Sequence, residues 1–273
     1  MVPYEPYHSF VVFCLLLLQH NIMKDDKKTV YLIRHAESEE NRRLASLGTV
    51  LSNVSRFQVP RSTDVWASLH LLNVSAQVDS SVSVVGKAQI DNVAQKLQAA
   101  DFLKTHKVTT VLHSPLQRAQ ETCQGLLQCL ADADAATDDD DVTKPSTSLQ
   151  NDNGIVRIKS LDILKEKTPA EWLPGNAKSL RRRLNAFEDD LAALPEVESV
   201  ICVVGHSQYF KNLLNLSYKF RNCDVYKVEF DATKRQQAST TATAENDVLP
   251  PQWSGLERLF ECSIDGEIED GGK

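Results

Sequence analysis

The chain has 273 residues, of which 42% are hydrophobic and 25% are charged, and these values predict a soluble globular protein with a substantial core. Its 30 Lys and Arg residues against 37 Asp and Glu residues give a net charge of −7, which argues against a general nucleic-acid-binding protein. The six cysteines form no CxxC pair, so the sequence indicates neither a zinc site nor a disulfide framework.

The first 22 residues differ from the rest of the chain. Nine consecutive apolar residues, 10–18, are too few to cross a bilayer, so we predict no stable membrane span. No Lys or Arg precedes them, and no small-residue cleavage site follows them, which makes them a poor signal peptide. Our hypothesis is that residues 1–22 are an upstream extension that need not belong to the mature protein, with translation starting at Met1 or Met23. We expect a cytoplasmic protein; the secretory pathway stays open if this extension acts as a signal.

Residues 23–230 alternate between strand and helix patterns. Runs rich in Val and Ile predict strands, and apolar side chains at helical spacing predict the helices between them. The predicted strands are 29–33, 108–112, 155–158, 200–204 and 225–230, and the predicted helices are 86–100, 116–130, 177–194 and 207–218. This alternation predicts a three-layer α/β/α sandwich with a mostly parallel sheet, and it leaves the strand order open.

Three segments interrupt this pattern. Residues 44–78 are an insertion too apolar for a simple solvated loop, and a lid, a specificity loop and a packing role are all open. Residues 131–153 are acidic and rich in Ala, Ser and Thr, which predicts a disordered surface loop. Residues 231–273 read as a polar linker and C-terminal tail with one last element near 256–264.

Polar residues follow three of the predicted strands directly. Arg34 and His35 end the first strand, His206 ends the fourth, and Arg118 lies just beyond the strand at 108–112 on the first turn of a helix. If these strands are neighbours in one parallel sheet, their carboxyl ends open on the same edge, where ligands bind in α/β folds. Two imidazoles and two guanidiniums would then meet there.

Such a cluster of cationic groups predicts an anionic ligand. The planar guanidinium of arginine suits phosphate oxygens, so a phosphoryl group is the expected occupant. A histidine can attack its phosphorus when the ring is unprotonated, and neighbouring arginines disfavour the imidazolium. The leaving alcohol then needs a proton from a carboxylic acid, for which Glu166 is the best candidate, with Asp162 and Glu171 as alternatives.

Four motifs in this chain resemble those of the histidine phosphatase superfamily, which includes the cofactor-dependent phosphoglycerate mutases. The resemblance extends from about residue 29 to residue 230. The four segments are Arg34-His35-Ala-Glu-Ser38 with Asn41, Asp79 to Gly86, Ser114-Pro-Leu-Gln-Arg118 with Thr122, and Val204-Gly-His206-Ser207. They occur in the family's order. The resemblance implies a phosphoglycerate mutase-like fold.

The resemblance also implies the role of each site residue. His35 would be the nucleophile that becomes phosphohistidine, and Arg34, Arg118 and His206 would hold the phosphoryl group with help from Asn41. Glu166 would be the acid that protonates the leaving group and later activates water. No metal and no cofactor would take part. Glu37 and Ser38 are expected to line the same site.

These observations predict a phosphatase acting on a small phosphorylated molecule, and they do not name that molecule. A cofactor-dependent phosphoglycerate mutase is the first alternative, and an inactive protein that binds a phosphorylated ligand is the second. The mutases carry a glycine-rich segment soon after the acid, whereas residues 167–174 here read Lys-Thr-Pro-Ala-Glu-Trp-Leu-Pro, which favours hydrolysis. The run 181–183 of three arginines could steer an anionic substrate or be an exposed helix face. The oligomeric state stays open.

Overall fold

The computed structural model describes residues 27–42, 79–127, 148–151, 154–166, 171, 177–235 and 247–264. The predicted extension 1–22 and the insertion 44–78 lie outside these residues, as does nearly all of the acidic segment.

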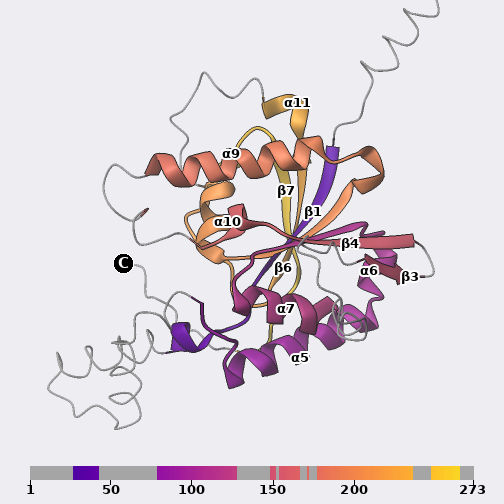
Figure 1. Ribbon diagram of the computed structural model, residues 1–273, viewed down its shortest axis with the longest axis vertical. Helices are drawn as coiled ribbons and strands as arrows, with labels where there is room; N and C mark the ends of the chain where they lie inside the picture. The colour runs from indigo at the N-terminus through magenta and orange to yellow at the C-terminus, as the bar shows by residue number, and fades with distance from the viewer. Residues whose placement is uncertain are drawn as a thin grey trace, which may run out of the picture.

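Two helical layers enclose a central sheet (Figure 1). The elements are β1 Lys27–Arg34, α5 Val84–Ala99, α6 Phe102–Thr105, β2 Thr110–His113, α7 Gln117–Leu127, β3 Ser148–Asn151, β4 Gly154–Ser160, the 3-10 turn η3 Asp162–Leu164, α9 Ala177–Ala193, the 3-10 turn η4 Glu196–Glu198, β5 Val200–Gly205, α10 Ser207–Leu213, β6 Val225–Asp231, α11 Ala232–Arg235 and β7 Trp253–Phe260.

The sheet has seven strands in the order β3-β4-β2-β5-β1-β6-β7. Its four central strands, β4, β2, β5 and β1, run parallel to one another. The outer strands β3, β6 and β7 pair antiparallel. The predicted α/β class with a parallel centre is therefore confirmed, and antiparallel pairing at both edges is a feature that the sequence pattern did not specify.

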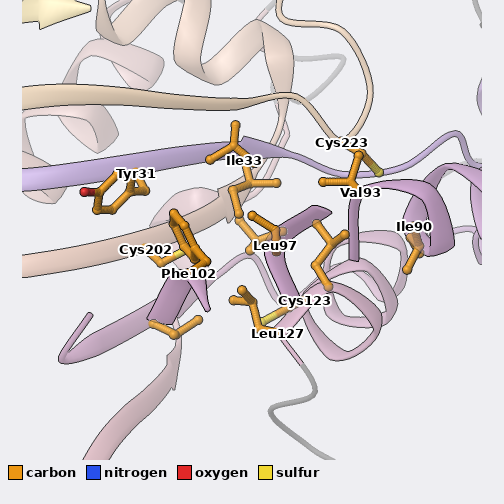
Figure 2. Packing of buried hydrophobic residues seen from close by; sticks show 14 of the residues in the cluster. Tyr31, Ile33, Ile90, Val93, Leu97, Phe102, Cys123, Leu127, Cys202 and Cys223 are labelled. Atoms are coloured by element: carbon orange, nitrogen blue, oxygen red, sulfur yellow. The ribbon is translucent and has the colours of Figure 1, made fainter. Parts of the chain in front are cut away.

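Alternate residues of the central strands pack on opposite faces of the sheet, as a strand requires. On β1, Tyr31 and Ile33 join the cluster that contains side chains of α5, α6 and α7, and Figure 2 shows this packing. Val30 and Leu32 join the second cluster, which contains side chains of α9 and α10. In Figure 1, α5 and α7 accordingly lie on the opposite side of the sheet from α9 and α10. Strands buried on both faces explain the nearly continuous apolar runs in the sequence.

Helix α5 begins where a close backbone contact fixes its position. Ser83 caps the helix by accepting a hydrogen bond from the Gly86 N–H at 3.0 Å. A Cβ atom on Gly86 would lie 2.1 Å from the carbonyl oxygen of Glu37, so only glycine fits there. The segment from Asp79 to Gly86 therefore joins the start of α5 to the loop that follows His35.

Three boundaries differ from the prediction. Helix α10 ends at Leu213 instead of Tyr218, and Asn215 then turns the chain with a φ of 55°. Residues 148–151, predicted as loop, form the edge strand β3. The last element is a strand that starts at Trp253, pairs with β6 and completes the sheet, so it belongs to the α/β domain rather than to a tail. The strand lacks a clear alternation because all its residues except Trp253 are exposed or only partly buried.

None of the described helices combines the length and the apolar character needed to span a membrane. The apolar run 10–18 lies outside the described residues.

Candidate active site

The four parallel strands end at the same level. Arg34 pairs with Gly205 across β1 and β5, and His113 pairs with Val204 on one side and Ser160 on the other. The residues that come next are therefore brought to one edge of the sheet. Their backbone continues the ladder for one more step, since the His35 N–H donates to the Gly205 carbonyl at 2.9 Å.

His35 is almost completely buried, with 2% of its surface exposed. Its Nδ1 lies 2.6 Å from the Ala36 carbonyl oxygen, which can only accept, so Nδ1 carries the hydrogen and Nε2 keeps its lone pair. Burial, then His206, Arg118 and Arg34, hold the pKa of His35 well below its usual value of 6.5. At neutral pH the ring is thus uncharged and Nε2 is available as a nucleophile.

His206 faces His35 at the end of β5. The two ring centroids lie 4.9 Å apart, and the rings are tilted by 62°. Its Nε2 forms a 2.8 Å hydrogen bond with Ser114 Oγ. Its Nδ1 lies 3.3 Å from Glu166 Oε2, at ion-pair distance but without the alignment of a hydrogen bond. Burial lowers the pKa of His206, and Glu166 partly opposes this shift.

Two guanidiniums flank the imidazoles. Arg34 is 4% exposed, and one of its terminal N–H groups donates to the Phe220 carbonyl at 2.6 Å. Arg118, also 4% exposed, donates to Glu40 Oε2 at 3.3 Å from the first turn of α7. Its Nε is buried and has no hydrogen-bond partner among the described residues. A buried N–H of a cation without a partner is costly, and an anionic ligand would remove that cost.

Of the three carboxylates considered for the acid, only Glu166 lies beside the histidines. It follows the turn η3, and its side chain is 30% exposed. The Asp162 side chain is 70% exposed and pairs with Lys165. Glu171 is buried against Arg183, with N–O distances of 3.1 and 2.6 Å. Contact with His206 therefore distinguishes Glu166 from the other two.

The described side-chain and backbone contacts of Glu37 and Asn41, which follow His35, are with the start of α5 and with a helical turn, respectively. Glu37 accepts a hydrogen bond from Ser83 Oγ at 2.7 Å, which ties it to the start of α5, and its place in the wall of the site stays a prediction. Asn41 lies on a helical turn, where its backbone N–H is 3.3 Å from Ser38 Oγ. The described contacts of Asn41 thus involve its backbone, and its part in phosphate binding stays a prediction.

Three residues that position the site were not assigned in the sequence. Ser114 is the partner of His206, and Asn222 donates to the His35 carbonyl at 2.8 Å. Thr122 accepts from the Ala36 N–H at 2.9 Å and donates to the Arg118 carbonyl at 2.6 Å. Ser114 and Thr122 belong to motifs quoted above, which could have identified them. Asn222 lies in a loop with no motif, so the sequence carried no comparable signal.

Geometry alone would let His35, Glu166 and His206 hold a metal ion, because their ligand atoms all lie within 4.8 Å of one another. The two guanidiniums, however, already disfavour a positive charge on His35. The same electrostatic repulsion disfavours a divalent cation and favours an anion. The arrangement therefore fits a phosphoryl group better than a metal.

Comparisons with known proteins give structural likenesses only, because no family model and no curated protein matches the sequence. A candidate phosphohistidine phosphatase SixA from Agrobacterium tumefaciens is 16% identical, with a TM-score of 0.39 over 75% of this chain and 91% of that one. A mycobacterial glucosyl-3-phosphoglycerate phosphatase with VO3 is 15% identical, with a TM-score of 0.39 over 74% and 92%. A phosphoserine phosphatase from Entamoeba histolytica with 3-phosphoglyceric acid is 15% identical, with a TM-score of 0.38 over 73% and 89%. Likenesses this distant carry no argument about activity.

Proposed function

We propose that this protein hydrolyses phosphate monoesters by double displacement, with His35 as the nucleophile. One observation carries the proposal: His35 is buried and uncharged, its Nδ1 is held by the Ala36 carbonyl, and His206, Arg118 and Arg34 are near enough to lower its pKa. Histidine is a weak nucleophile when protonated, and this environment keeps it unprotonated. The proposal names a reaction and a site, and it leaves the phosphorylated molecule unidentified.

In the first step, His35 Nε2 attacks phosphorus as the bond to the ester oxygen breaks. Arg34, Arg118 and His206 stabilise the negative charge on the three other phosphoryl oxygens. The departing alkoxide takes a proton from the Glu166 carboxyl group and leaves as an alcohol. His35 is then phosphorylated and Glu166 is a carboxylate.

In the second step, water replaces the alcohol. The Glu166 carboxylate takes one proton from this water as its oxygen attacks phosphorus. The bond from phosphorus to His35 Nε2 breaks, and inorganic phosphate leaves. Both residues return to their starting states, so no metal or organic cofactor is needed for balance.

The test is phosphate release from sugar phosphates, nucleotides, inositol phosphates and phosphopeptides, together with trapping of an acid-labile, base-stable phosphoenzyme. His35→Ala should lower turnover at least about 10³-fold and abolish labelling, since the nucleophile is gone. His106→Ala is the matched control, because His106 contacts Tyr31 and Phe102 rather than the site residues. Unchanged hydrolysis by His35→Ala would refute the mechanism.

The same assay separates hydrolysis from the two alternatives. Incubation with 3-phosphoglycerate and a bisphosphate primer would yield isomer without free phosphate if the protein were a mutase. Saturable vanadate binding with no turnover on any substrate would identify a binding protein. Either result would replace the proposal.

A further inference from the structure

His35 and His206 each follow a strand directly, whereas Glu166 lies in a loop. It stands two residues beyond the turn η3, after β4 has ended at Ser160. Loops are less rigid than the elements that they connect. A general acid must nevertheless be held within hydrogen-bond reach of the reacting oxygen. Something other than secondary structure must therefore fix this loop.

The side chain of Arg183 makes that connection. From helix α9, its terminal N–H groups donate to the carbonyl oxygens of Ile163 at 3.2 Å, Lys165 at 2.7 Å and Glu166 at 3.4 Å. The same guanidinium donates to both carboxylate oxygens of Glu171, at 3.1 and 2.6 Å. A guanidinium has five N–H donors, and these five contacts use all of them.

Arg183 also contacts the helix that follows His206. Its guanidinium carbon lies 5.8 Å from the ring centroid of Tyr209, within the range of a cation–π contact. Tyr209 is fully buried in α10, and its hydroxyl donates to the Arg183 carbonyl at 3.4 Å. Arg183 therefore links the loop that carries Glu166 to the element that begins at His206.

The charge of Arg183 is already balanced. Glu171 is 5% exposed and serves as the counter-ion, and the Arg183 side chain is 19% exposed. With every donor engaged and its charge neutralised, Arg183 is poorly suited to attract a substrate anion. Its neighbours Arg181 and Arg182 are exposed on the same helix. The arginine run thus contains one structural member and two surface members.

We propose that Arg183 is a positioning residue that holds the Glu166 carboxyl group beside His206 for proton transfer to the leaving group. This inference rests on the proposed function, since it assigns a support to the acid of that reaction. Lysine cannot replace it fully, because a single ammonium offers three donors in place of a planar fork of five. The loss on substitution should therefore appear in the step that needs an acid.

The experiment compares two classes of phosphate ester. An alkyl phosphate has a poor leaving group and needs the acid, whereas a nitrophenyl phosphate has a good one and does not. The measured quantity is kcat/KM, which includes only the steps up to alcohol release and so excludes hydrolysis of phospho-His35. Glu166→Gln sets the reference, with an expected loss of about 10²-fold or more on the alkyl ester.

Arg183→Ala should reproduce this pattern in weaker form. We expect a loss of about tenfold or more on the alkyl ester and less than about threefold on the nitrophenyl ester, because a carboxyl group displaced by about 1 Å acts poorly. Arg181→Ala and Arg182→Ala should change neither value. If Arg183→Ala does not fold, Arg183→Lys takes its place. Its loss of kcat/KM on the alkyl ester is then compared with its loss on the nitrophenyl ester.

Two results would overturn the inference while leaving the proposed function intact. One is an equal loss on both esters in a variant of normal melting temperature, which would indicate a general structural role. The other is no loss on either ester. Failure of the proposed function looks different: the unmodified protein would release no phosphate from any ester and form no phosphohistidine.

Discussion

The two halves of the candidate active site are held in place by different means. His35 and His206 directly follow β1 and β5, and they are 2% and 0% exposed. Glu166 belongs to a loop, and its side chain is 30% exposed. A ladder of backbone hydrogen bonds supports the first half, whereas the second half is a loop whose backbone carbonyls accept hydrogen bonds from the Arg183 guanidinium.

This difference predicts two kinds of response to mutation. A packed sheet spreads its support over many contacts, so changes near the strand ends affect stability and every catalytic step together. A partly exposed loop outside the sheet can shift locally without disturbing the core. Changes there should alter one chemical step and leave the fold intact.

The largest effect on the strand side is expected from Thr122→Val. Valine has nearly the same shape but cannot accept the hydrogen bond from Ala36, and a buried N–H without a partner costs about 1–3 kcal/mol. Because the Ala36 carbonyl also holds His35 Nδ1, activity should fall equally on alkyl and nitrophenyl esters. Denaturant unfolding measures the loss of stability, and kcat/KM on the two esters measures the loss of activity. Thr105→Val, at an exposed position, is the control, and a loss confined to alkyl esters would contradict the comparison.

A second expectation concerns stability at acidic pH. The pKa values of His35 and His206 are lowered in the folded protein, mainly by burial, whereas the unfolded chain regains the usual value of about 6.5. At pH values between the lowered pKa values of the folded protein and about 6.5, the unfolded chain binds more protons than the folded protein does. The free energy of unfolding should therefore fall as the pH decreases below about 6.5.

Denaturation at pH 7.5 and pH 5.5 in phosphate-free buffer tests this expectation. His35→Asn removes one of the rings whose pKa is lowered, so its stability should depend less steeply on pH than that of the unmodified protein. Equal steepness in both proteins would show that His35 does not contribute.

The smallest effect is expected at the edge of the site, from Glu40→Gln. The Glu40 carboxylate lies 3.3 Å from an Arg118 guanidinium nitrogen and would repel the oxygens of a bound phosphoryl group. Partly exposed ion pairs contribute about 0.2–1 kcal/mol, so the neutral variant should bind vanadate up to about fivefold more tightly. Glu39→Gln is the matched control, because Glu39 pairs with Arg42 instead. Weaker vanadate binding by Glu40→Gln would contradict this assignment.

The strand pattern could be predicted because both faces of the central strands are buried. Apolar runs preceded Arg34 and His206, and each run proved to be a parallel strand with its carboxyl end at the same edge. The last strand was harder to recognise, since Trp253–Phe260 lies at the sheet edge with a glycine and two charged residues. Edge strands lose the regular pattern because one side faces solvent.

The acid could not be chosen with the same certainty. Asp162, Glu166 and Glu171 lie within ten residues of one another, and nothing in their spacing separates them. Only contacts that are distant in sequence do so, namely Arg183 on Glu171 and His206 beside Glu166. For the same reason the arginine run could not be divided into one half-buried member and two exposed members.

The sequence by itself determined the residue types and the central strands that carry them, because local hydrophobic patterning fixes which segments become buried strands. It also placed Arg34, His35 and His206 at strand ends. The tertiary structure alone decided which carboxylate stands beside His206, that Ser114 is its partner, and that Arg183 secures the Glu166 loop. These choices depend on side chains from different elements meeting in space, and local patterning carries no information about such meetings.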